Sequence, residues 1–157
     1  MTPSLRTYLV RHGEAAPGPV DAQRPLTASG RRSVEAAARR LVERGVVVAE
    51  IQHSGLLRAR QTADSLGAAL ELPRGIRAVD ALGPEDDPEE ARGRLEASTE
   101  PLLLVGHLPH LARLVAALVG KDGVVAFQPA TVVCLARGVG AWTVEWVLDS
   151  PPAPTAP

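Results

Sequence analysis

The sequence predicts an α/β sandwich: a largely parallel central sheet with helices on both faces. Short apolar runs alternate with amphipathic segments along the chain, the pattern of strands followed by covering helices. Polar residues directly follow three of these runs. At 157 residues and 45% apolar composition, the chain has the size of one domain. We therefore expect a single domain over residues 1–150 and a disordered, proline-rich tail over residues 151–157.

The first two predicted elements are a strand and a helix. The strand is the apolar run Thr7–Val10. A loop rich in Pro and Gly follows, and Thr27 is placed to cap a helix from about Ala28 to Arg44. Gly45 ends that helix. Its apolar stripe has the spacing of one helix face: Val34, Ala37, Ala38, Leu41 and Val42.

The middle of the chain repeats the alternation. A β-branched run predicts a strand over Val46–Gln52, and apolar spacing predicts a helix over Leu57–Leu70. Pro73 separates this helix from a third strand, Ile76–Val79. An acidic helix then begins at residues 86–88 and ends near Ala97.

The last third of the chain predicts a strand, a helix and a hairpin. Leu102–Val105 is a buried strand, and Pro109 suits the first position of the helix that follows. Thr131–Ala136 and Thr143–Val147 pair as a hairpin around the glycines at 138 and 140. We detect no internal repeat.

Composition excludes several classes of protein. A net charge of −1 and a pI near 6.4 provide no electrostatic footprint for nucleic acid. Apolar runs of four to six residues are too short for a membrane span, which needs roughly 18, and no signal peptide is visible. Cys134 is the single cysteine, so we expect no intramolecular disulfide and interpret it as a small core residue. We therefore expect a cytoplasmic protein that contacts neither membrane nor nucleic acid.

Polar clusters follow three of the predicted strands. Arg11 and His12 follow the first, Ser54 and Arg58 follow the second, and His107 follows the fourth. Because the carboxyl ends of parallel strands meet at one sheet edge, these side chains should converge there. Two of the clusters also precede helices, whose N-termini attract anions. Guanidinium groups pair bidentately with phosphate oxygens, so the cluster predicts a site for a phosphoryl group.

Two further histidines have less specific interpretations. His53 precedes Ser54 and points to the opposite side of its strand, so we expect a structural role. His110 either lines the mouth of the pocket or lies on the exposed face of its helix. With His107 it forms a His-x-x-His pair, but no third ligand accompanies the pair, so we expect no metal site.

These residues resemble a known family. Arg11–Gly13 is similar to the signature of the histidine phosphatase superfamily, which includes the cofactor-dependent phosphoglycerate mutases, and most of all to its short SixA-like branch of phosphohistidine phosphatases. Four further stretches agree in order, and the resemblance extends over roughly residues 7–147. They are Arg24–Thr27, Ser54–Thr62, Gly83–Glu90 and Val105–Pro109. Gly55 departs from the pattern, which usually has Pro after the serine.

The resemblance implies a phosphoglycerate mutase-like fold and a mechanism. His12 would be the nucleophile that forms a phosphohistidine intermediate, with a backbone carbonyl such as that of Gly13 fixing its tautomer. Arg11, Arg58 and His107 would bind the phosphoryl oxygens and stabilise the charge that they carry during transfer. Ser54 would add a hydrogen bond in the same pocket. No metal or other cofactor is implied, because the arginines supply the positive charge.

The general acid has several candidates. Longer members of the family carry a carboxylate in an insertion that this chain lacks, and other short members can carry Glu at about the position of Ala81. The nearby acids here are Asp80, Glu85, Asp86 and Asp87. An alkoxide leaving group would need a strong donor, whereas imidazole has a pKa of about 6.5 and leaves readily once protonated.

Three functions remain open at this point. The first is a phosphatase acting on a phosphorylated protein, such as a histidine phosphotransfer domain in bacterial signal transduction. The second is a phosphatase acting on small phosphomonoesters. The third is a non-catalytic phosphate-binding module. The presence of His12 counts against the third, because a degenerate member is expected to lose its nucleophile first. A mutase is not expected, since the insertion that grips a sugar phosphate is absent.

Overall fold

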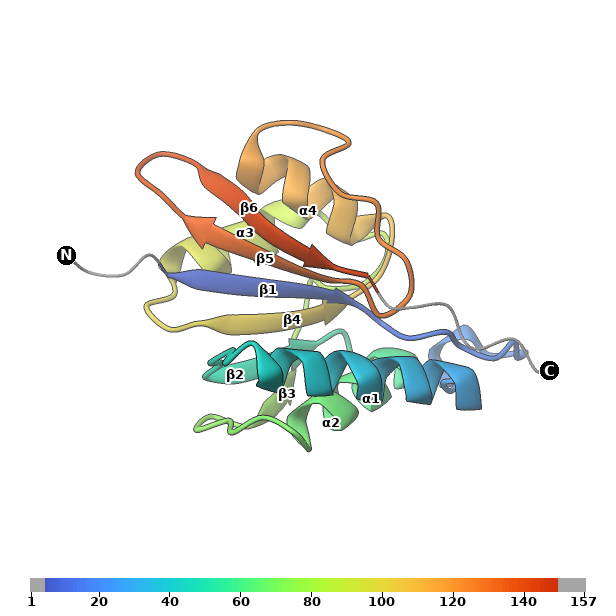
Figure 1. The fold of residues 1–157 in the computed structure, drawn as a ribbon. Coiled ribbons are helices and arrows are strands. Elements are labelled where there is room, and N and C mark those ends of the chain that lie inside the picture. Colours follow the sequence, from blue (N-terminus) through green and yellow to red (C-terminus); the bar gives the residue numbers. More distant parts are fainter. Residues whose placement is uncertain (1–4, 150–157) are drawn as a thin grey trace.

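A computed structural model describes residues 5–149, which form one six-stranded sheet with helices on both faces (Figure 1). The strand order is β3-β2-β4-β1-β5-β6. The four strands β3, β2, β4 and β1 are parallel, whereas β5 and β6 run antiparallel to their neighbours. The predicted mostly parallel sheet is therefore confirmed. The strands are β1 (Arg6–Arg11), β2 (Glu50–His53), β3 (Ile76–Ala78), β4 (Leu102–Gly106), β5 (Val132–Arg137) and β6 (Trp142–Leu148).

The helices cover the sheet in two pairs. One pair, α1 and α2, lies on one face, and the other pair, α3 and α4, lies on the opposite face (Figure 1). A short 3-10 turn, η1, precedes α1. The bounds are η1 (Asp21–Gln23), α1 (Ala28–Glu43), α2 (Leu57–Gly67), α3 (Pro88–Ala97) and α4 (His110–Val119).

The sheet separates two hydrophobic cores. Along β1, Tyr8 and Val10 pack with α1 and α2, whereas Leu9 packs with α3 and α4. This alternation follows from the two-residue period of a strand, since successive side chains point to opposite faces. Both faces of the central strands are thus buried, which explains why these strands are continuous apolar runs in the sequence.

Helix starts agree closely with the predicted signals. The Thr27 side chain accepts a hydrogen bond from the Gly30 N–H at 2.9 Å and caps α1, as predicted. Asp87 caps α3 by accepting from the Glu89 N–H at 3.0 Å. Pro109 stands at the N-cap of α4 and not at its first position, a difference of one residue.

Two predicted bounds are wrong. The strand expected over Val46–Gln52 forms only from Glu50, because the backbone of the preceding residues bonds outside the sheet. The Val46 N–H donates to Leu41 in the last turns of α1, and the Ala49 N–H donates to Pro101 before β4. The helix expected to reach Leu70 ends at Gly67. The hairpin over β5 and β6 is confirmed, and the tail predicted over 151–157 lies outside the described residues.

Candidate active site

The ends of β1, β2 and β4 bring together the predicted site residues. Arg11 pairs with Gly106 in the β1–β4 register, and the His12 N–H donates to the Gly106 carbonyl at 3.1 Å. The imidazole rings of His12 and His107 lie 5.0 Å apart between centroids. Residues separated by almost a hundred positions in sequence therefore meet at the sheet edge where parallel strands end.

His12 is held as a neutral imidazole of one tautomer. Its Nδ1 lies 2.7 Å from the carbonyl oxygen of Gly13. Since a carbonyl only accepts, Nδ1 carries the proton and Nε2 keeps its lone pair. Burial lowers the pKa of His12 to about 4, opposed by the Gly13 bond and assisted by the charges of Arg58 and Arg11. At neutral pH the Nε2 atom is therefore an available nucleophile.

Gly13 connects this histidine to α2. Its N–H donates to Thr62 Oγ1 at 3.0 Å, and the same hydroxyl donates to the Arg58 carbonyl at 2.8 Å. A Cβ at Gly13 would lie 2.8 Å from Cγ2 of Val34, so the close approach to α1 requires glycine here. The predicted nucleophile and the predicted arginine of α2 are thus joined through one side chain.

Arg11 presents an unpaired donor within the site. Its Nη1 donates to the Phe127 carbonyl at 3.0 Å, which fixes the guanidinium, while its Nε is buried and has no hydrogen-bond partner within residues 5–149. Burial lowers the pKa of Arg11. A buried N–H without an acceptor is costly, and a phosphoryl oxygen would satisfy it.

His107 and Ser54 form a second unit. Ser54 Oγ lies 2.6 Å from His107 Nε2, and the Leu56 N–H donates to the same hydroxyl at 3.3 Å. In the part of the chain that the structure describes, His107 Nδ1 is buried and has no hydrogen-bond partner, like the Nε of Arg11. Burial lowers the pKa of His107 to about 3, assisted by His12 and Arg58. Ser54 therefore contacts the second histidine, and each of the two clusters contains one buried nitrogen that the described residues do not satisfy.

Arg58 is buried in the first turn of α2 and contacts a residue that the sequence did not single out. Its Nη1 donates to the Asp21 carbonyl at 2.9 Å, and its Nη2 lies 3.2 Å from Asp21 Oδ2. Asp21 stands in η1, within a loop of Pro, Gly and polar residues. Such a loop has no periodicity, so the sequence carries no signal that places Asp21 beside Arg58.

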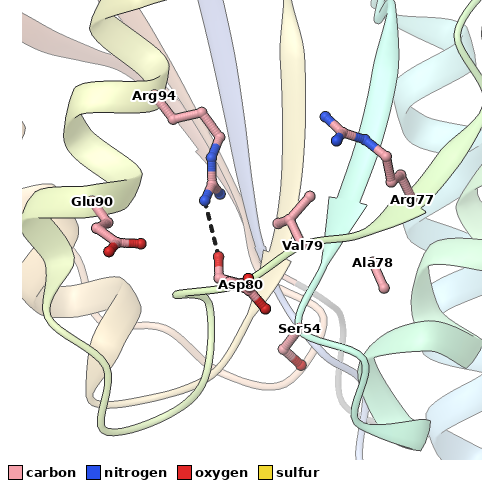
Figure 2. Close-up of a pocket in the computed structure, with 7 residues that line it drawn as sticks. All are labelled: Ser54, Arg77, Ala78, Val79, Asp80, Glu90 and Arg94. Atoms are coloured by element: carbon pink, nitrogen blue, oxygen red, sulfur yellow. Dashed lines mark hydrogen bonds between the residues drawn. The ribbon is translucent and has the colours of Figure 1, made fainter.

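The acid candidates occupy different places. Asp80 lines a pocket of about 440 Å³ together with Ser54, Arg77, Ala78, Val79, Glu90 and Arg94. Figure 2 shows the Asp80 carboxylate on the Ser54 side of this pocket, while its carbonyl accepts from Arg94 Nη2 at 3.0 Å. Ser54 thus belongs to both the pocket and the histidine cluster.

The other three acids do not line that pocket. The Glu85 side chain is 81% exposed, and its Oε2 lies 3.9 Å from Arg113 Nη1. Asp86 accepts from the Gly83 N–H at 2.7 Å, and Asp87 caps α3. Each of these carboxylates therefore has a local partner.

The remaining histidines and the cysteine are buried. His53 accepts a hydrogen bond from the Gly55 N–H at 3.1 Å, which fits the structural role expected for it. The alternative that placed His110 on an exposed helix face is wrong, because this side chain lies completely inside, at the first residue of α4. Cys134 is a buried core residue, as predicted.

Across residues 5–149, no group of three or more His, Cys, Asp or Glu side chains is arranged to hold a metal ion. In the same part of the chain, no helix has the length and apolar character needed to cross a membrane. The positive charge at the histidine cluster comes from Arg11 and Arg58.

Comparison with known proteins agrees with the geometry. The family model for the histidine phosphatase superfamily (branch 1) matches the sequence over residues 7–82. Phosphohistidine phosphatase SixA of Escherichia coli (strain K12) is 32% identical over 119 residues, which are 73% of this chain and 74% of that protein. An uncharacterized protein of Picosynechococcus is 36% identical over 127 residues, 76% of each chain.

Solved structures agree in fold. The protein histidine phosphatase SixA complexed with tungstate superposes with a TM-score of 0.87 at 28% identity, covering 93% of this chain and 97% of that one. A putative phosphohistidine phosphatase SixA from Agrobacterium tumefaciens gives a TM-score of 0.81 at 26% identity, covering 94% and 99%. The chain belongs to the histidine phosphatase superfamily, branch 1, and its homologues there include SixA-like phosphohistidine phosphatases.

Proposed function

We propose that the protein is a phosphatase that transfers a phosphoryl group to His12 and then to water. The hydrogen bond from His12 Nδ1 to the Gly13 carbonyl carries this proposal, because it leaves Nε2 unprotonated beside the arginines. The buried, unpartnered Nε of Arg11 and Nδ1 of His107 support it, since both can bind phosphoryl oxygens. The SixA structure that holds tungstate, a tetrahedral oxyanion like phosphate, supports it as well.

The reaction has two steps. In the first, the His12 Nε2 lone pair forms a bond to phosphorus while the bond from phosphorus to the leaving group breaks, and the leaving group takes up a proton. In the second, water attacks the phosphorus of the phosphohistidine, which returns His12 as a neutral imidazole and releases phosphate. Arg11, Arg58 and His107 stabilise the charge on the phosphoryl oxygens in both steps. We propose that no metal is required.

A protein phosphohistidine is the substrate that we favour. SixA homologues carry that substrate in their names, and the partner would be a domain such as a histidine phosphotransfer domain. An imidazole leaving group, with a pKa of about 6.5, needs no strong acid in the enzyme. A substrate that needs no strong acid suits a site in which Asp86 and Asp87 accept backbone N–H groups and Glu85 is 81% exposed, outside the pocket beside Ser54.

A small phosphomonoester is the second candidate. The pocket beside Ser54 is about 440 Å³ and could receive a compact leaving group. Asp80 lines that pocket and would be the proton donor for an alkoxide.

Phosphate release in the presence of EDTA tests these proposals. A phosphohistidine protein and p-nitrophenyl phosphate are compared side by side, with His12→Ala as the control. Faster release from the phosphohistidine protein supports the favoured substrate, and release from the ester alone supports the second. Phosphate binding without release from either substrate would show a non-catalytic binding module, and loss of activity with EDTA would contradict metal independence.

A further inference from the structure

Asp21 holds the terminal nitrogens of Arg58. The Asp21 carbonyl accepts a hydrogen bond from Arg58 Nη1, and Asp21 Oδ2 accepts one from Arg58 Nη2. The Arg58 side chain is only 6% exposed, whereas the Asp21 side chain is 64% exposed. A buried cation without a counter-ion is unfavourable. The Asp21 carboxylate is therefore needed to keep the Arg58 guanidinium in its buried position.

Asp21 is itself fixed by the loop that carries it. Its Oδ1 lies 3.1 Å from Arg24 Nη1, and Arg24 Nε donates to the Ala16 carbonyl at 2.9 Å. The Ala16 N–H in turn donates to the Pro25 carbonyl at 2.8 Å. The two arginines hold the pKa of the Asp21 carboxyl below its usual range, so it stays ionised at neutral pH. The Asp21 carboxylate therefore bridges Arg24 and Arg58, and backbone hydrogen bonds within the loop hold Asp21 in place.

We infer that Asp21 is a positioning residue for catalysis, which orients the guanidinium of Arg58 toward the phosphoryl group. This inference rests on the proposed function. A planar guanidinium has five N–H groups, and two contacts to one residue fix its plane and leave three donors for other acceptors. An Arg58 that rotates freely would bind phosphoryl oxygens less well in the transition state, where orientation matters most.

The contact differs from an ordinary surface ion pair. Arg60 and Asp64 on α2 also pair, but both side chains are exposed and their atoms are 3.9 Å apart. Pairs of that kind contribute little. Asp64→Asn is therefore a matched control, because it removes an aspartate that pairs with an arginine two residues from Arg58 on the same helix.

A double-mutant cycle tests the inference. We expect Asp21→Asn and Asp21→Ala to lower kcat/KM about tenfold or more, mainly through kcat, and to weaken the affinity for inorganic phosphate several-fold. In an Arg58→Ala background, Asp21→Asn should change neither kcat/KM nor the phosphate affinity by more than about twofold, because the guanidinium that Asp21 contacts is absent. If Arg58→Ala is too weak to measure, Arg58→Lys serves, because an ammonium group has no planar fork for the two contacts to orient.

Three results would overturn the inference. The first is an Asp21→Asn variant that behaves like Asp64→Asn. The second is an effect of equal size with and without Arg58. The third is tighter phosphate binding by Asp21→Asn, which would make Asp21 a competitor for Arg58. Thermal unfolding of every variant identifies losses caused by misfolding.

Phosphate affinity, measured by calorimetry, does not depend on turnover. Suppose that the wild-type protein releases no phosphate, while Asp21 and Arg58 are coupled in phosphate binding. The proposed function then fails, and so does the catalytic role of Asp21. Asp21 would still orient Arg58 for anion binding. If His12→Ala abolishes turnover while Asp21→Asn is silent, the inference alone fails.

Discussion

Ser54 Oγ lies 2.6 Å from Nε2 of His107, so the serine contacts the second histidine of the cluster directly. The same hydroxyl accepts the Leu56 N–H at 3.3 Å, which leaves its own proton available for Nε2. With that proton on the Ser54–Nε2 bond, the neutral ring carries its proton on Nδ1, which is buried and has no hydrogen-bond partner among residues 5–149. We propose that Ser54 in this way selects the tautomer of His107 that can donate to an oxyanion.

Replacement of Ser54 tests that relationship. Ser54→Ala should lower kcat/KM about tenfold, because His107 loses the contact that fixes its ring and tautomer. Ser98→Ala is the control, since the hydroxyl of that serine bonds to the backbone of Glu100, two residues away. Steady-state kinetics with an unchanged circular dichroism spectrum would provide the check. Equal activity of the two variants would contradict the role given to Ser54.

The proposed role of His12 as nucleophile has a direct test. His12→Ala should abolish phosphate release while phosphate binding, through Arg11, Arg58 and His107, is largely retained. Acid-labile, base-stable labelling after mixing with a phosphorylated substrate should appear in the wild-type protein and be absent from the variant. Turnover that survives the substitution would refute the mechanism.

The buried histidines predict a dependence of stability on pH. The folded-state pKa values of His12 and His107 are lowered to about 4 and about 3, below the unfolded value of 6.5. The unfolded chain therefore binds more protons, so stability is complete above pH 6.5 and declines as pH falls toward 4. Each group contributes at most about 1.4 kcal/mol per pH unit in that window.

Urea unfolding at pH 7 and pH 5 measures this effect. The free energy of unfolding should be lower at pH 5, and the difference should shrink in His12→Ala. A pH dependence that the substitution leaves unchanged would show that His12 does not titrate in this way.

Gly13 should be intolerant of any side chain. A Cβ there would lie 2.8 Å from Cγ2 of Val34 and 3.0 Å from the Gly30 carbonyl, so Gly13→Ala must shift the loop that bears His12. We expect a loss of activity of tenfold or more and destabilisation of about 1–3 kcal/mol. Gly93→Ala is the control: it lies in α3 with open space around it and should stabilise by about 0.5–1 kcal/mol. Normal activity of Gly13→Ala would contradict the close packing.

The sequence predicted those parts of the site that follow from strand ends. Arg11, His12 and His107 could be placed together because an apolar run that stops at a polar cluster fixes both the strand and its edge. Asp21 could not be found, since its contact with Arg58 depends on the path of an aperiodic loop. The start of β2 was misplaced because β-branched residues such as Val47 also occur in loops, where tertiary hydrogen bonds decide the backbone conformation.

The hydroxyl of Thr62 couples two parts of the proposed site. It accepts from the backbone beside His12 and donates to the backbone of Arg58. A displacement of α2 along its axis would therefore pull on the backbone beside His12, the proposed nucleophile. The proposed attacking atom and the proposed cation are coupled through one interior oxygen atom that two segments of main chain share.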